Sequence, residues 1–347
     1  MSDTATPRAD AIGTPPAAPP AGGGHPSGLT RLTTVFLRQR EATVLVIAVA
    51  MFIYFSLSAP DFLTRASITN ISQYMAPYVI LAIGEVLLLV CGEIDLSVGF
   101  VWTMSPFLMM FLVNWGLPVI LAIIVTVALS TTVGLINGVV TTYFGVPSLI
   151  TTVGTGFIVL GFTLQISAAQ QKPLPPSSVA IGHWFGTYAW SEIIWATVLV
   201  VVFQILLTRT RWGLYTISAG GNLLGAAEAG VKIRKIKIGN FMAASGLGAF
   251  AGVLEAFKNS IIDPSAGTLD VVLIALVGAV IGGTAMAGGS GTMIGAWVGM
   301  LVLGILNDGF NLLGISTNPY QIILGVAIVV AMVANTYLTR LRRAGRT

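Results

Sequence analysis

Charged residues are scarce in this chain. Asp, Glu, Lys and Arg make up 9% of its 347 residues, against about 25% in ordinary soluble domains, whereas 55% of the residues are hydrophobic. The mean hydropathy is +0.89. This composition excludes an ordinary soluble domain and predicts an all-α polytopic membrane protein, since the alternating apolar and polar pattern of a transmembrane barrel is absent.

Cysteine and histidine are also nearly absent. The single thiol, Cys91, can form neither a disulfide framework nor a cysteine metal site. His25 lies in a polar N-terminal stretch, and His183 has no second ligand at suitable spacing, so no metal site is expected. The chain also lacks a G-x-x-x-x-G-K-[ST] phosphate loop and a Ser/His/Asp set. These absences predict that the chain is not an enzyme and binds no cofactor.

Composition divides the chain into three parts. Residues 1–30 are rich in Pro, Ala, Gly and Thr, so we expect a disordered tail. The tail lacks the basic start, apolar core and cleavage site of a signal peptide. Residues 31–340 form the predicted transmembrane domain, which includes a polar, basic loop at 208–237, and residues 341–347 form a basic tail.

Apolar runs recur at bilayer length, about 20 residues each. They predict about ten transmembrane helices, over 42–59, 69–91, 97–114, 117–141, 148–168, 188–207, 238–257, 270–287, 292–308 and 319–338. The short pairs around Gly92 to Gly99 and Gly282 to Gly291 are either separate spans or broken, re-entrant segments. The two halves of the sequence show no self-similarity strong enough to predict an internal repeat.

Basic residues are distributed unevenly between the loops. With ten crossings, the termini and the 208–237 loop share one side, which carries fourteen of the 17 Lys and Arg residues. By the positive-inside rule this side, with both tails, is cytoplasmic. The longest connection on the opposite side, at 169–188, contains prolines and is expected to be an external loop. The pI near 9.3 follows from this asymmetry and requires no nucleic acid.

The segment C-G-E-I-D-L-S-V-G at 91–99 places two carboxylates between apolar runs. Charge and irregular backbone are tolerated there only where protein or a water-filled path satisfies them. The segment is either a tight polar turn or a helix break that lines a polar path. We expect Asp95 to cap the following helix by accepting the backbone N–H groups near Ser97 and Val98.

The 208–237 loop is expected to contain a short helix at 223–229. Asn222 is a suitable N-cap, Gly230 is a suitable stop, and Leu223, Leu224 and Ala227 would form an apolar side. This helix either rests on anionic lipid at the membrane surface or is gripped by a cytoplasmic partner protein.

Four segments resemble the permease subunits of bacterial ABC sugar importers of the ribose, xylose and galactose type. They are G-E-I-D-L-S-V-G at 92–99, G-G-N-L-L-G-A-A-E-A-G-V at 220–231, I-G-G-T-A-M-A-G-G-S-G-T-M-I-G-A at 281–296 and G-I-L-N-D-G-F-N-L-L-G-I at 304–315. The match keeps order and spacing over about three quarters of the chain.

The resemblance implies the ABC importer permease fold and a path for a sugar or polyol across the bacterial inner membrane. The implied partners are a cytoplasmic ATPase that binds ATP and Mg, a periplasmic sugar-binding protein and a second permease copy, identical or not. The implied ATPase-coupling residues are Gly220, Gly221, Asn222, Leu223, Leu224, Ala227, Glu228 and Gly230. The residues implied to break helices or line the path are Glu93, Asp95, Ser97, Gly99, Gly282, Gly283 and Thr284.

Candidate substrate contacts are the polar groups near apolar spans: Asn70, Gln73, Asn137, Gln165 and Asn307. A conduit needs only low affinity, so a dedicated pocket is not expected to stand out in the sequence. The alternative function is an ion-coupled secondary transporter of a small polar solute. Such a protein would place coupling carboxylates at the bilayer midplane, and Glu85, Glu93 and Asp95 are the candidates.

Overall fold

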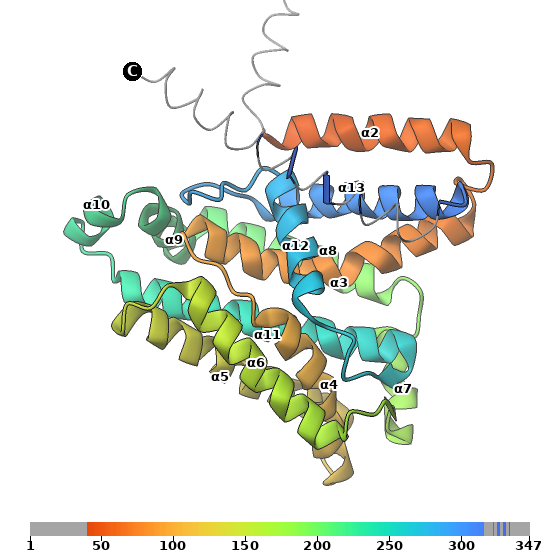
Figure 1. The fold of residues 1–347 in the computed structure, drawn as a ribbon, viewed down its shortest axis with the longest axis horizontal. Helices are drawn as coiled ribbons and strands as arrows, with labels where there is room; N and C mark the ends of the chain where they lie inside the picture. Colours follow the sequence, from red (N-terminus) through yellow and green to blue (C-terminus); the bar gives the residue numbers. More distant parts are fainter. Residues whose placement is uncertain (1–39, 316–321, 323–324, 327–328, 331–332, 334–347) are drawn as a thin grey trace, which may run out of the picture. The chain divides into compact units, whose positions relative to one another are not determined.

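The computed structural model describes residues 40–315 together with 322, 325–326, 329–330 and 333 (Figure 1). The described chain is almost entirely helical, which confirms the all-α fold class. The predicted tails, at 1–30 and 341–347, lie outside the described residues, as does most of the predicted span at 319–338. The boundaries of the domain between the tails stay a prediction.

Apolar runs of bilayer length form the long helices. Those that correspond to predicted spans are α2 (Arg40–Ser58), α3 (Arg65–Val90), α4 (Val98–Asn114), α5 (Val119–Tyr143), α6 (Ser148–Ser167), α8 (Ser191–Arg209), α11 (Ile233–Asn259), α12 (Leu269–Ile281) and α13 (Met293–Leu312). Within the described residues, 6 helices are long and apolar enough to cross a membrane, namely α3, α5, α6, α8, α11 and α13. The structure confirms a multi-pass membrane protein, while the count of ten spans and the side of the termini stay predictions.

Helices α3 and α11 form the centre of the bundle. Their apolar windows are 83% and 78% buried, against 28% in both α6 and α8, which therefore expose most of their surface. The two central helices approach closely at Gly84, where a Cβ would lie 2.8 Å from the Ala244 Cα. Asn240, early in α11, bonds to the Leu87 carbonyl oxygen, late in α3, so the two helices run antiparallel.

The elements after α3 and after α11 follow one pattern. Each long helix ends at an irregular segment, the first junction (91–97) or the second junction (260–268), which leads into a shorter helix, α4 or α12. The first half of the bundle contains α3, α4 and α5, and the second contains α11, α12 and α13. The long helix of each half packs on the helices of the other: α3 packs on α12 and α13, and α11 packs on α4 and α5. Since α3 and α11 are antiparallel, this arrangement is an inverted repeat.

The two junctions also carry the same sequence motif. The first reads I-D-L-S-V-G at 94–99 and the second reads I-D-P-S-A-G at 262–267. In each, the Ser N–H and the Ser hydroxyl donate to Asp Oδ1 at 2.8 and 2.6 Å. The final glycines face each other, because a Cβ on Gly267 would overlap the Gly99 carbonyl oxygen. This internal repeat was not predicted from the sequence.

Two connections contain structure that was not predicted. The 169–188 connection, predicted as a plain loop, forms β1 (Lys172–Pro173), the 3-10 helix η1 (Pro176–Ser178) and α7 (Val179–Phe185), and β1 pairs antiparallel with β2 (Ile261–Ile262). Proline is tolerated in a first helical turn, which is where Pro176 lies. The 208–237 loop contains α9 (Arg211–Gly221) ahead of the predicted short helix, α10 (Leu223–Glu228). The end of the bundle with α9 and α10 is termed the α10 end (Figure 1). The end at which α11 finishes, where β1 pairs with β2, is termed the β end.

Candidate functional site

The first junction is held by buried hydrogen bonds around Asp95. Asp95 is 0% exposed. Asn137 on α5 donates from Nδ2 to Asp95 Oδ2 at 3.2 Å and to the Ser97 hydroxyl at 2.8 Å. Thr155 on α6 donates to Asn137 Oδ1 at 2.6 Å. A carboxylate out of water needs such donors, so α5 and α6 stabilise the helix break.

The predicted capping role of Asp95 is confirmed only in part. The Ser97 backbone N–H donates to Asp95 as expected. The N-cap of α4, however, is Ser97 itself, whose side chain makes no capping bond. Asp95 therefore closes a short turn ahead of the helix, of the kind in which an Asp side chain accepts the N–H two residues on.

The neighbouring glutamates have different surroundings. Glu93 forms an ion pair with Lys237 at the start of α11. Glu85, inside α3, is 1% exposed, and neither of its carboxylate oxygens has a hydrogen-bond partner among the described residues. Two of the three carboxylates that an ion-coupled mechanism would use, Glu93 and Asp95, therefore already have partners within the protein.

Helix α10 exposes the apolar residues that the sequence singled out. Asn222 caps it by accepting a backbone N–H at 3.0 Å, and Gly230 has φ +83° just beyond its end. Leu223 and Leu224 are 49% and 76% exposed, and Ala227 is exposed as well. Adjacent exposed apolar side chains are typical of a contact surface. Glu228 also lies exposed on this helix.

Helix α9 connects α10 to the two central helices. Trp212 on α9 donates from Nε1 to Asn240 Oδ1 at 2.8 Å. Asn240 is fully buried on α11, and its Nδ2 donates to Thr216 Oγ1 on α9 at 3.3 Å and to the Leu87 carbonyl oxygen on α3 at 3.4 Å. A single buried amide thus joins α9, α11 and the end of α3.

The glycine-rich connection at 282–292 packs against the same region. The Gly289 N–H donates to the Val90 carbonyl oxygen, at the end of α3, at 2.8 Å. A Cβ on Gly220 would overlap that same oxygen, so α9 approaches α3 as closely as backbone permits. Gly221, by contrast, would place a Cβ in ordinary contact, 3.7 Å from the Gly289 Cα. The end of α3, the end of α9 and the 282–292 connection therefore meet at the α10 end.

The remaining predicted helix-break residues lie inside the bundle. Gly282 packs against α13, where a Cβ would overlap the Gly295 carbonyl oxygen. Gly283 has φ +94°, in the left-handed region that favours glycine, and Thr284 is buried. Gly99 allows α4 to approach the second junction, since a Cβ there would clash with the Thr268 carbonyl oxygen.

The five candidate substrate contacts stay a prediction, and none of them lines the pocket described below. They are spread over α3, α5, α6 and α13: Asn70, Gln73, Asn137, Gln165 and Asn307. Asn137 is part of the first junction, and Asn307 accepts a hydrogen bond from Asn311 one turn further on. A different set of polar residues meets beside the second junction.

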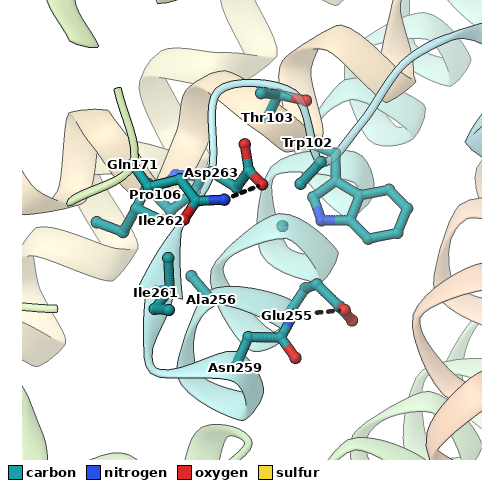
Figure 2. A pocket seen from close by; sticks show the side chains of 12 residues that line it. Trp102, Thr103, Pro106, Gln171, Glu255, Ala256, Asn259, Ile261, Ile262 and Asp263 are labelled. Carbon is teal, nitrogen blue, oxygen red and sulfur yellow. Dashed lines mark hydrogen bonds between the residues drawn. The ribbon is translucent and has the colours of Figure 1, made fainter. Parts of the chain in front are cut away.

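A pocket of about 210 Å³ lies beside the second junction, toward the β end (Figure 2). Its lining residues include the Trp102 ring and the polar side chains of Thr103, Gln171, Glu255, Asn259 and Asp263. Sequence reasoning missed all of them, because they come from α4, α11, the second junction and the chain just before β1. The repeated I-D-x-S-x-G motif was the signal that points to Asp263.

Asp263 is fixed as a charged acceptor in this pocket. The hydroxyl and N–H of Ser265 donate to its Oδ1, and Gln171 Nε2 donates to its Oδ2 at 2.7 Å (Figure 2). The Ser265 bonds, more than any other contact, lower the pKa of Asp263 below its usual value. The carboxylate therefore stays ionised at neutral pH.

The second carboxylate, Glu255, lies on α11. Asn259 donates to its Oε1 at 2.9 Å, and Lys258 donates to its Oε2 at 2.6 Å. Lys258 also lies 3.7 Å from the buried Glu192 on α8. One cation thus holds two carboxylates in place and orients the Glu255 side chain at the pocket.

The bundle combines membrane-spanning helices, two interrupted helix pairs and a polar pocket. A cluster of His, Cys, Asp and Glu that could hold a metal ion is absent from the described residues. Irregular backbone at membrane depth occurs where it is enclosed by protein or lines a cavity, and this combination defines a membrane transport protein.

The family assignment is more specific. The chain belongs to the family described as the branched-chain amino acid transport system / permease component, whose model matches residues 67–332. The protein is therefore a transport subunit rather than an enzyme. No solved structure matches the chain.

Several curated relatives are sugar import permeases, which confirms the resemblance. The chain is 37% identical over 303 residues to the xylose/arabinose import permease protein XylH of Sulfolobus acidocaldarius, covering 85% of this chain and 83% of the relative. It is 30% identical over 312 residues to the L-arabinose ABC transporter permease protein AraH of Azospirillum brasilense, covering 89% and 91%. It is 28% identical over 316 residues to the ribose import permease protein RbsC of Escherichia coli, covering 89% and 97%.

Proposed function

We propose that this chain is the permease subunit of an ATP-driven ABC importer for a sugar or related polyol. The family assignment supports the permease role, and the printed names of the relatives, which refer to xylose, arabinose and ribose, support the substrate class. The bacterial inner membrane is the proposed location.

The observation that carries this proposal is the connection between α10 and the central helices. Leu224 is 76% exposed on a helix that is too short to be stable on its own. Behind it, α9 is joined through Asn240 to α11 and to the end of α3. A partner that moves α10 would therefore move the ends of the helices that border the first junction.

The proposed partners follow from this geometry and from the family. A cytoplasmic ATPase, which would carry ATP and Mg, docks on α10, and a periplasmic sugar-binding protein delivers substrate at the β end. A second permease copy, identical or not, completes the membrane unit. The basic residues near α9 and α11, Arg209, Arg211, Lys232, Arg234, Lys235 and Lys237, support a cytoplasmic α10 end.

The contacts of the candidate carboxylates argue against the alternative function, ion-coupled transport. Glu93 has an ionic partner and Asp95 has three donor groups, so protonating either would break existing contacts. Of these three candidate carboxylates, Glu85 alone has oxygens without a hydrogen-bond partner among the described residues. The family assignment favours the ATP-driven mechanism.

ATP hydrolysis by the assembled transporter tests the proposal. The chain would be purified with its ATPase and placed in nanodiscs, and hydrolysis would be measured with and without the sugar-loaded binding protein. We expect the loaded binding protein to stimulate hydrolysis in the complex but not in the ATPase alone. Equal hydrolysis with and without the permease would overturn the proposed role.

A further inference from the structure

We propose that the pocket beside the second junction is a low-affinity binding site for one neutral monosaccharide or polyol. This inference rests on the proposed importer function, and it specifies where the substrate contacts the permease. The pocket is lined by residues at the end of α11 and by β2, so it lies at the β end, where substrate would be delivered, whereas α10 precedes the start of α11.

The groups around the pocket match the chemistry of a sugar. Hydroxyl groups donate to carboxylates and accept from amides, and the C–H face of a sugar ring packs on an aromatic ring. Glu255 and Asp263 supply carboxylates, Gln171 and Asn259 supply amides, and Trp102 supplies the ring. Figure 2 shows Glu255 with Asn259 on one wall, Asp263 with Gln171 across the pocket from them, and Trp102 at the side.

The volume also fits a single small ring. The pocket has a volume of about 210 Å³. It is smaller than the pockets that enclose drug-sized ligands, which begin near about 300 Å³. A disaccharide would have to extend out of the pocket.

The two junctions differ in the surroundings of their aspartates. At Asp95, Asn137 reaches from α5 and fills the space beside the carboxylate. At Asp263, which has the same Asp–Ser turn, Gln171 takes one oxygen, and the carboxylate borders the pocket. Gln171 thus donates to Asp263 as Asn137 donates to Asp95, but Asp263 borders the pocket whereas Asp95 is 0% exposed, so a sugar hydroxyl would reach only Asp263.

The charge of the pocket specifies a neutral ligand. Two carboxylates border it, its lining residues include no Lys or Arg, and Lys258, which contacts Glu255, is shared with Glu192. An anionic substrate such as a sugar phosphate would be repelled. The carboxylates already have protein donors, so a sugar would gain only a few new bonds, and weak binding suits a conduit that must release its cargo.

Saturation-transfer NMR tests the proposal, because it detects ligands that bind weakly. Xylose, arabinose and ribose would be added singly to the full-length permease in nanodiscs, with ribose 5-phosphate as the charged comparison. The variants are Asp263→Asn, which removes the charge but keeps the shape, and Ala266→Trp, which fills the pocket while both carboxylates are retained. Asp61→Asn, at an exposed turn outside the pocket, is the matched control.

We expect a transfer signal from at least one neutral pentose and none from ribose 5-phosphate. Ala266→Trp should abolish the signal, and Asp263→Asn should weaken apparent affinity about tenfold, the size of one lost charged hydrogen bond. Asp61→Asn should leave it unchanged. In the complete transporter, the pocket variants should lower the maximal uptake rate while the half-saturating concentration, set by the binding protein, stays the same.

A wild-type permease that gives no signal with any neutral pentose, or pocket variants that match the wild type, would overturn the pocket assignment. Neither result would affect binding-protein-stimulated ATP hydrolysis, on which the proposed function depends. A signal that survives Ala266→Trp would place the sugar elsewhere and likewise overturn the assignment.

Discussion

Buried polar residues determine the geometry of both helix breaks. Backbone groups that a break releases inside a membrane must find partners within the protein. At each junction an Asp–Ser turn supplies them, and at the first junction Asn137 adds an amide. Close glycine contacts then set how near the helices come. Substitutions at these positions should act through hydrogen bonding and packing rather than through charge alone.

Asp95 provides the first test. Asp95→Ala leaves the Ser97 and Asn137 donors buried without an acceptor, which should cost about 2 kcal/mol of stability. Asp95→Asn keeps an oxygen that can accept from Ser97 and should retain most of the stability and uptake. Thermal unfolding in detergent and uptake at matched membrane expression measure both effects. If Asn proves as damaging as Ala, the charge itself is required and the hydrogen-bonding account fails.

Gly220 and Gly221 form a matched pair for the second test. A Cβ on Gly220 would overlap the Val90 carbonyl oxygen, whereas a Cβ on Gly221 meets only an ordinary contact at 3.7 Å. Gly220→Ala should push α9 away from α3 and reduce stimulated ATP hydrolysis, and Gly221→Ala should leave it near the wild-type rate. Two variants with equal activity would show that the close approach is not needed.

The elements at the α10 end form one connected unit. Helix α10 exposes its apolar side, α9 joins it to Asn240, and the ion pair between Lys237 and Glu93 joins α11 to the first junction. These contacts all lie at one end of the antiparallel central pair. A partner that docks on α10 therefore acts on both halves of the repeat at once.

A charged substitution on the exposed side of α10 tests whether the ATPase docks there. Leu224→Asp should weaken ATPase binding about tenfold or more, because a carboxylate would be desolvated in an apolar contact. Leu224→Met keeps an apolar side chain and should bind as the wild type does. Affinity between the purified permease and its ATPase measures the difference, with thermal unfolding as a check on the fold. An unchanged affinity for Leu224→Asp would remove α10 from the interface.

Exchanging the two charges of the Lys237 and Glu93 ion pair tests whether the pair matters for uptake. Lys237→Glu places two carboxylates together and should lower uptake, since both side chains are mostly buried, at 16% and 10% exposure. The double variant Lys237→Glu with Glu93→Lys restores the pairing and should recover a large part of the loss. A double variant no better than the single one would show that the pair does not connect α11 to the junction.

At the scale of the whole molecule, much of the architecture could be predicted. Apolar runs of bilayer length marked several long helices within a few residues, as α5 (Val119–Tyr143) against 117–141 illustrates, but the run at 270–287 extends six residues beyond the end of α12 (Leu269–Ile281). Asn222 and Gly230 marked the ends of α10 because capping chemistry is local. Helix α9 was missed because its sequence, R-W-G-L-Y-T-I-S-A-G-G, contains three glycines and one charge, and its stability comes from contacts with α11 and α3.

Features that depend on distant contacts could not be predicted. The partner of Asp95 is Asn137, which lies 42 residues away, and Gln171 reaches Asp263 over 92 residues. No spacing rule connects such pairs, because antiparallel packing of the two halves brings them together. The repeated motif is six residues long within a chain of 347, so it became recognisable only when the structure placed both copies at equivalent junctions.

The most direct test of the central claim is sugar uptake by proteoliposomes that contain the permease, its ATPase and its binding protein. Uptake of labelled pentose would be followed with ATP inside the vesicles, with a non-hydrolysable ATP analogue, and with an imposed proton or sodium gradient but no ATP. We expect uptake only with ATP, unaffected by collapse of ion gradients. Uptake driven by an ion gradient without ATP would contradict the account.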